Sequence, residues 1–229
     1  MAILKQNNLG KLSGTSGEYI YRIRNGKVVQ YKRPGNQQVS NSKAAKSARV
    51  SFAMNIKFAV FINSFPSIKL IWKKAKIKGT THFQKIIKHN SLFTKNYGIS
   101  IHNIITPPAI PLMVKSLLIS MDKIRLNIVL DSEEIKNLIN SKFILHFFFY
   151  LYEPRKKSYE QFSFRGFVNE YEENQINDIH QIEVKFDNEF RSYLIKYRKT
   201  IIYLAASSSY TNSKKIIWTS TYAKELNLI

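Results

Sequence analysis

The sequence has no cysteine and little glycine or proline. Its 229 residues include 8 Gly, 6 Pro and no Cys. Without cysteine, disulfide frameworks, thiolate zinc sites and cysteine nucleophiles are all excluded. The low glycine and proline content, together with 44% hydrophobic residues, excludes collagen-like, low-complexity and wholly disordered chains. We therefore expect a folded protein with a substantial hydrophobic core.

Acidic residues are also scarce, and they are unevenly placed. The chain has 15 Asp+Glu against 36 Lys+Arg, a formal net charge of +21. Residues 1–100 contain 19 Lys+Arg and a single acid, Glu18, whereas residues 101–229 contain 17 Lys+Arg and 14 acids. So much charge of one sign repels itself, and a polyanionic partner relieves the repulsion. Nucleic acid is the commonest such partner.

Long apolar runs and targeting signals are missing as well. The apolar run at residues 1–8 is too short for a signal peptide. The most apolar window, Phe143–Tyr152, is interrupted by His146 and closed by Glu153-Pro154. It falls well short of the ~20 residues that cross a bilayer as a helix, and it is typical of a buried strand. We expect a cytoplasmic protein, or one held within an assembled particle.

Prolines concentrate near the middle of the chain. Three of the six fall in residues 106–111, where they remove amide donors and favour extended backbone. The charge balance changes at nearly the same place. We therefore predict a basic hairpin-plus-helices region at residues 1–97, a proline-rich linker at residues 98–111 and a β-sandwich domain at residues 112–229.

A β-hairpin is predicted near the N-terminus. Two short alternating runs, Glu18–Arg24 and Lys27–Arg33, flank the dipeptide Asn25-Gly26. Asn-Gly between such runs favours a tight hairpin turn, because both residues tolerate positive φ. The turn fixes the register and makes one face of the hairpin more basic. The predicted pairs are Arg24–Lys27, Ile23–Val28, Arg22–Val29, Tyr21–Gln30 and Ile20–Tyr31.

Three helices are predicted to follow the hairpin. Ser42 is a candidate cap for a helix that runs to about Asn63, with a cationic side opposite an apolar side. A second helix is predicted at residues 67–78, and a third begins after Thr81, which has the Thr-x-x-Gln spacing of a capping box. The apolar side of the first helix is predicted to contain Ala45, Ala48, Phe52, Ile56, Ala59 and Ile62.

The C-terminal half alternates short apolar runs with turn-like segments. Strands at this spacing are typical of an antiparallel immunoglobulin- or fibronectin-like β-sandwich of about seven strands. Together with the helices of the first half, they predict an α+β fold. The predicted strands are residues 117–121, 124–130, 143–152, 161–168, 179–186, 193–196, 200–205 and 216–222.

Catalytic and metal-binding patterns are weak. The loop that carries Gly10, Gly14 and Gly17 lacks the preceding strand, the Gly-Lys-Ser/Thr ending and the following helix of a phosphate loop. The five histidines lack the spacing of a zinc hydrolase helix. The acids at Glu133–Glu134 and residues 170–178 lie in predicted polar loops, and no Gly-x-Ser-x-Gly motif is present. We expect a non-enzymatic protein without a metal or cofactor.

The basic half therefore carries the functional prediction. Tyrosines and cations alternate along the hairpin, a mixture that can stack bases and neutralise phosphates. The same tyrosines can instead pack as cross-strand pairs, and the cationic side of the first helix can simply face solvent. We predict a nucleic-acid-binding protein that contacts phosphates with little sequence preference. Its candidate binding residues are Tyr21, Arg22, Arg24, Lys27, Tyr31, Lys32, Arg33, Lys43, Lys46, Arg49 and Lys57.

Two other interpretations of the same charge stay open. One is a structural or adhesive assembly protein of a virion, filament or surface, in which the β-sandwich packs against other copies and the basic arm contacts a neighbour or a packaged genome. The other is a membrane-surface protein, because residues 67–78 combine Trp72 with five lysines. Fold class alone does not decide between these functions.

Several short motifs follow one another along most of the chain. They are the Ser13-Gly14 and Gly17 loop, the Asn25-Gly26 hairpin, Pro34, the Arg49-x-x-Phe52 step, Gly79 with Phe83 and Asn90, and the closing Tyr203, Ser220 and Tyr222. In this order they resemble an uncharacterised family of small Bacteroidota proteins with a domain of unknown function. Tyr31 and Ala45 depart from the family pattern, which has arginine and glutamine there. The resemblance implies a basic N-terminal element followed by a fibronectin-like sandwich, and no known activity, cofactor or catalytic residue.

Overall fold

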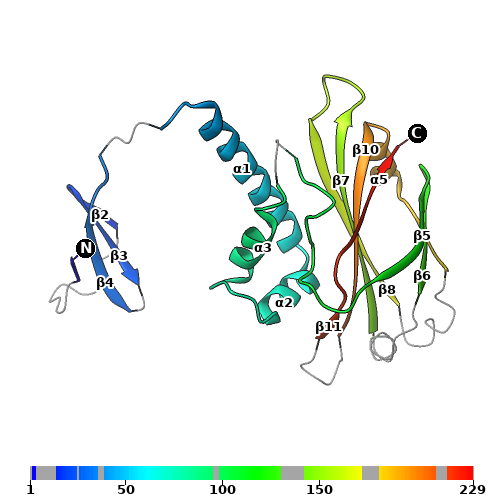
Figure 1. The fold of residues 1–229 in the computed structure, drawn as a ribbon, viewed down its shortest axis with the longest axis horizontal. Helices are drawn as coiled ribbons and strands as arrows, with labels where there is room; N and C mark the ends of the chain where they lie inside the picture. The colour runs from blue at the N-terminus through cyan, green and yellow to red at the C-terminus, as the bar shows by residue number, and fades with distance from the viewer. Residues whose placement is uncertain are drawn as a thin grey trace. The chain divides into compact units, whose positions relative to one another are not determined.

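The chain forms two compact units, Met1–Ala45 and Lys46–Ile229. Figure 1 shows the course of the chain in this computed structural model. The structure describes residues 2–3, 14–24, 26–35, 39–94, 98–129, 142–171, 181–209 and 216–228. Much of the predicted glycine loop, Asn25 of the hairpin turn and the acidic pair Glu133–Glu134 lie outside these residues.

The first unit contains a four-stranded antiparallel sheet with the strand order β1-β4-β3-β2. Its strands are β1 (Ala2–Ile3), β2 (Gly14–Ser16), β3 (Tyr19–Arg24) and β4 (Lys27–Lys32). All five predicted hairpin pairs are present, from Arg24 opposite Lys27 to Ile20 opposite Tyr31. Gly26 has a φ of +75°, the left-handed conformation that the tight turn requires. The predicted hairpin and its register are confirmed.

A five-stranded antiparallel sheet forms the centre of the second unit. Its strands are β7 (Lys142–Pro154), β8 (Phe162–Tyr171), β10 (Tyr197–Ser209), β11 (Ile216–Trp218) and β12 (Tyr222–Asn227). The strand order is β11-β10-β7-β8, and β12 also pairs with β10. Residues 143–151 of β7 are all buried. A continuous apolar run is what a strand covered on both faces needs, so the predicted buried strand is confirmed.

Helices cover one face of this sheet, as Figure 1 shows. They are α1 (Lys43–Asn63), α2 (Pro66–Lys74) and α3 (His82–Asn90). The predicted caps are present: Ser42 Oγ accepts the Ala45 amide at 3.2 Å, and Thr81 Oγ1 accepts the Gln84 amide at 3.2 Å. The shared core joins buried residues of all three helices to β7 and β10, including Phe58, Ile71, Ile86, Phe148 and Tyr203.

A smaller sheet and a short helix cover the other face of the five-stranded sheet. They are β5 (Met113–Ile119), β6 (Lys123–Val129), β9 (Gln181–Lys185) and α5 (Asn188–Leu194), and the strand order is β5-β6-β9. The second core lies between these elements and the large sheet, and it includes Leu126, Phe147, Phe149 and Leu194. The second unit is therefore a three-layer α+β structure with antiparallel sheets, in agreement with the predicted fold class.

The predicted proline-rich linker does not separate two domains. The backbone amides of Ile105 and Thr106 both donate to Thr221 Oγ1 at 2.9 Å, and both residues are fully buried. These bonds attach the segment to the end of the large sheet. The structure divides the chain after Ala45 instead of at residues 98–111, because the three helices share a core with C-terminal strands.

Two predicted strands need correction. Residues 193–196 do not form a strand: they lie at the end of α5 and in the turn that follows it, and Asp187 caps that helix by accepting the Phe190 amide at 2.7 Å. The predicted strand at residues 216–222 is divided into β11 and β12. Between them, Thr219 Oγ1 accepts the Ala206 amide of β10 at 2.8 Å in place of the Thr219 carbonyl, and the Thr219 amide donates to the Ala206 carbonyl at 2.9 Å.

The buried side of α1 also differs from the prediction. Its first buried residue is Met54, and the side continues through Phe58 and Ile62. Ala48 and Phe52, which the spacing places on the apolar side, are exposed, and Phe52 is 60% exposed. The helical period alone does not show where along a helix the covering layer begins. The second helix, α2, ends at Lys74, four residues earlier than predicted.

Candidate nucleic-acid interface

One face of the hairpin in the first unit brings cations and an aromatic ring together. Cross-strand pairing puts Arg22, Arg24, Lys27 and Tyr31 on this face. The Arg22 guanidinium carbon lies 5.6 Å from the centre of the Tyr31 ring. All three cations are exposed, and Tyr31 is half-buried. The face therefore presents three positive charges next to an aromatic surface.

The remaining hairpin candidates lie elsewhere on the sheet. Tyr21 and Lys32 are on the opposite face from Tyr31, and Arg33 follows the end of β4. Lys32 Nζ lies 3.3 Å from the carboxylate of Glu18, and these side chains are 72% and 73% exposed. An ion pair so exposed is weak, so it leaves Lys32 accessible to an anion. The structure does not bring the two predicted stacking tyrosines together.

A second group of candidate cations follows one side of α1. Lys46, Arg49 and Lys57 are exposed, and helical spacing puts them on the same side. Lys57 Nζ lies 5.1 Å from the centre of the Phe162 ring on β8. Lys43 is also exposed; it is the first residue of α1 and belongs to the first unit. All nine predicted cations are thus exposed, in two groups that belong to different units.

Lysines of α2 and of the segment after it were not among the candidates. Their sequence signal is the five lysines of residues 67–78, which the membrane-surface interpretation uses. That interpretation requires Trp72 at the surface. The structure buries Trp72 completely, and its indole nitrogen donates to the Ile105 carbonyl at 2.8 Å. The lysines therefore lie on a helix whose aromatic residue points into the core.

The structure also shows the surroundings of His146, the histidine within the most apolar segment of the sequence. His146 is fully buried in β7, with Nε2 2.9 Å from Ser207 Oγ, as expected for an interior histidine. Burial lowers the pKa of His146 to about 3, so the imidazole is neutral near pH 7.

Among the described residues, no three His, Asp or Glu side chains are grouped to hold a metal ion. In that same part of the chain, no helix combines the length and apolar character needed to cross a bilayer.

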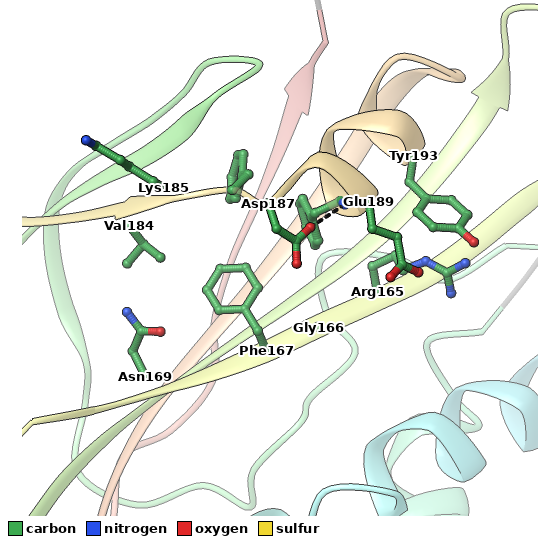
Figure 2. Close-up of a pocket in the computed structure, with 11 residues that line it drawn as sticks. Arg165, Gly166, Phe167, Asn169, Val184, Lys185, Asp187, Glu189 and Tyr193 are labelled. Atoms are coloured by element: carbon green, nitrogen blue, oxygen red, sulfur yellow. Dashed lines mark hydrogen bonds between the residues drawn. The ribbon is translucent and has the colours of Figure 1, made fainter.

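A pocket of about 370 Å³ opens between β8, β9 and α5 (Figure 2). Phe167 and Phe190 line it, and the rings of Phe186 and Phe190 stack with their centres 4.7 Å apart. At the rim, the Arg165 guanidinium carbon lies 3.5 Å from the centre of the Tyr193 ring. The described lining residues include no Ser, Thr or His, and none of the predicted binding residues. The pocket has the size of a small-molecule site, and its lining also includes the polar side chains of Lys185, Asp187 and Glu189.

Comparisons with family models, curated proteins and solved structures find no match for this chain. The resemblance to a Bacteroidota family of unknown function therefore stays a prediction.

Proposed function

We propose that this protein is a non-enzymatic nucleic-acid-binding protein that contacts phosphates with little sequence preference. The observation that supports the proposal most directly is the hairpin face on which Arg22, Arg24 and Lys27 lie with Tyr31. The first unit has eight Lys+Arg and one acid in its sequence, and that acid already faces Lys32. A surface of this kind attracts a polyanion over a long range.

The expected mode of binding follows from the side chains available. Arginine and lysine contact phosphate oxygens, which fixes position on the nucleic acid but carries no sequence information. Tyr31 offers a ring face to an unpaired base, and stacking tolerates any base. The exposed cations of α1 add phosphate contacts in the second unit. The protein would therefore bind many sequences with an affinity that falls steeply with salt.

A salt titration of the full chain tests the proposal. Fluorescence anisotropy with a labelled oligonucleotide, single- or double-stranded, measures affinity between 50 and 200 mM salt. If six to ten phosphates are contacted, affinity should fall by about 10³ to 10⁵ over this range. The double variant Arg22→Gln/Arg24→Gln should reduce the slope of log affinity against log salt by about two.

The matched control is Lys156→Gln/Lys157→Gln, which removes two exposed charges from the turn between β7 and β8. It should change the slope much less, because these lysines belong neither to the hairpin face nor to the α1 group of candidate cations. Absence of binding at 50 mM salt would reject the proposal. Equal losses in both double variants would show that only total charge matters.

A structural or assembly role is the second candidate, and one observation favours it. Met113 and Leu118 on β5 are 60% and 63% exposed, and exposed apolar side chains on a strand can pack against another copy. We also propose that the packed sheets of the second unit are immunoglobulin- or fibronectin-like, and that the protein acts in the cytoplasm or inside a particle. Concentration-dependent assembly without oligonucleotide binding would favour this role over the first.

A further inference from the structure

The helical layer carries a third group of cations, which belongs neither to the hairpin nor to the α1 candidates. Lys69 and Lys73 are exposed, one turn apart on α2, and His82 begins α3. Burial, followed by the positive charges of Lys69, Lys73 and Lys85, lowers the pKa of His82. His82 therefore lies within electrostatic range of these three lysines. The group spans two helices.

Lys85 fixes the two helices that present this group. Its side chain is buried, and Nζ donates to the carbonyls of Trp72 at 3.3 Å and Ala75 at 2.7 Å, at the C-terminal end of α2. The stem of Lys85 passes so close to Gly79 that a Cβ there would lie 2.6 Å from Lys85 Cγ. The connection between α2 and α3 is thus tightly packed, and the lysines above it have a rigid support.

The charge of this group is not balanced by acids in the same layer. No acid occurs in the sequence between Glu18 and Asp122, so α1, α2 and α3 carry no carboxylate. The Lys85 ammonium is held by carbonyl oxygens rather than by a carboxylate, so its full positive charge adds to that of the surface. Like charges held together on a rigid surface repel one another, and an anion bound between them removes the repulsion.

We propose that the α2–α3 surface formed by Lys69, Lys73 and His82 is a further binding surface for the phosphodiester backbone of nucleic acid. This inference rests on the proposed function and adds a surface on α2 and α3 to the hairpin face and the α1 cations. Because these surfaces belong to one chain, binding at one makes binding at another intramolecular and raises the overall affinity. Trp72, the ring that a membrane interface would take up, is buried, so the charge chemistry favours nucleic acid over lipid.

The test uses the full chain with two charge-removing double variants. Lys69→Gln/Lys73→Gln removes the proposed contacts, and Lys115→Gln/Lys157→Gln removes two exposed charges from the other elements of the second unit. Both pairs are exposed, so far-ultraviolet circular dichroism should show an unchanged fold. Anisotropy with the same oligonucleotide measures the salt slope. We expect the α2 variant to lower the slope by about two and the control to change it by much less.

The outcomes separate this inference from the proposed function. If the wild-type chain fails to bind at 50 mM salt, the proposed function is rejected, and this inference with it. If the wild-type chain binds but the α2 variant behaves like its control, the inference alone is overturned. Binding that needs Lys69 and Lys73 for vesicles of anionic lipid but not for the oligonucleotide would also overturn it, and would assign the surface to a membrane.

Discussion

The large sheet of the second unit carries a different layer on each face, and the layers differ in how their charges are balanced. On the helical side, α1, α2 and α3 contain no acid. On the other side, Glu183 of β9 lies 2.7 Å from Arg125 Nε and 3.1 Å from Lys123 Nζ of β6. Both sides contribute a buried aromatic core to the same sheet. Packing therefore does not explain the difference in charge.

The proposed function gives this contrast a physical reason. Cations that serve only solubility can be mixed with acids at no cost to the fold, as they are around β6 and β9. Under the proposed function, an acid-free layer keeps a positive potential that attracts an anion. The first unit resembles the helical layer in this respect, since its single acid is outnumbered eight to one. We expect the two layers to contribute similarly to the free energy of unfolding and differently to oligonucleotide affinity.

The largest expected effect comes from removing a core ring on either face of β7. On the helical side, the ring centres of Phe148 and Phe65 are 4.5 Å apart. On the other side, the ring centres of Phe147 and Phe167 are 4.9 Å apart. Either Phe→Ala substitution should reduce the free energy of unfolding by about 3–5 kcal/mol. Chemical denaturation followed by circular dichroism measures it.

The same pair of variants tests whether the helical layer is a domain of its own. Because helices and strands share the core around Phe148, helical and sheet signals should disappear in one transition in both variants. Loss of helix at low denaturant in Phe148→Ala, with the sheet still folded, would contradict the shared core and restore the boundary at residues 98–111.

A smaller effect is expected from acid, through His146. Burial lowers the pKa of His146 from the usual 6.5 to about 3. Between these two pH values the imidazole is protonated in the unfolded chain and neutral in the folded chain. Stability is therefore complete above pH 6.5 and is lost as the pH falls towards 3. At pH 5 the loss should be about 2 kcal/mol, from a slope of about 1.4 kcal/mol per pH unit.

The control is His146→Leu, which cannot take up the proton. It leaves Ser207 Oγ without its imidazole partner, so the variant should be less stable at pH 7, but its stability should change little between pH 7 and 5. Denaturant midpoints at the two pH values measure both proteins. Parallel losses in wild type and variant would assign the acid sensitivity to other groups, such as His82, whose pKa is also lowered.

Local chemistry allowed several of these features to be predicted. The hairpin register follows from Gly26, whose positive φ permits the tight turn, and the helix starts follow from the side-chain caps of Ser42 and Thr81. The buried strand follows from the largely apolar run of residues 143–151, which only His146 interrupts. The exposure of the candidate cations was also predictable, because lysine and arginine are rarely buried without a partner. Each of these depends on residues close together in the sequence.

Contacts between distant residues could not be predicted in this way. The proline segment is tied to Thr221, more than a hundred residues later, and nothing near Ile105 signals that bond. The sequence gives no sign that Lys85 differs from the surface lysines. In the structure Lys85 is buried, and its Nζ donates to the Ala75 carbonyl at the C-terminal end of α2. The proposed α2–α3 surface was missed for the same reason, since the sequence does not show that Trp72 is buried while Lys69 and Lys73 stay exposed.

The smallest expected effect comes from Glu183→Gln, which breaks the charge balance of the sheet-covered side. Hydrogen bonds from Arg125 and Lys123 hold the pKa of Glu183 below its usual 4.5. The ionised group therefore adds stability above pH 4.5, and this contribution is lost as the pH falls through the lowered pKa. Thermal melts should show a slightly less stable variant at pH 7 and no difference from wild type in strong acid. The substitution also removes the acidic partner of the exposed Arg125 and of the half-buried Lys123. Oligonucleotide affinity should still rise far less than it falls in Lys69→Gln/Lys73→Gln, because the surrounding acids remain. An equal rise would mean that any pair of free cations binds nucleic acid, and the contrast between the two layers would carry no functional meaning.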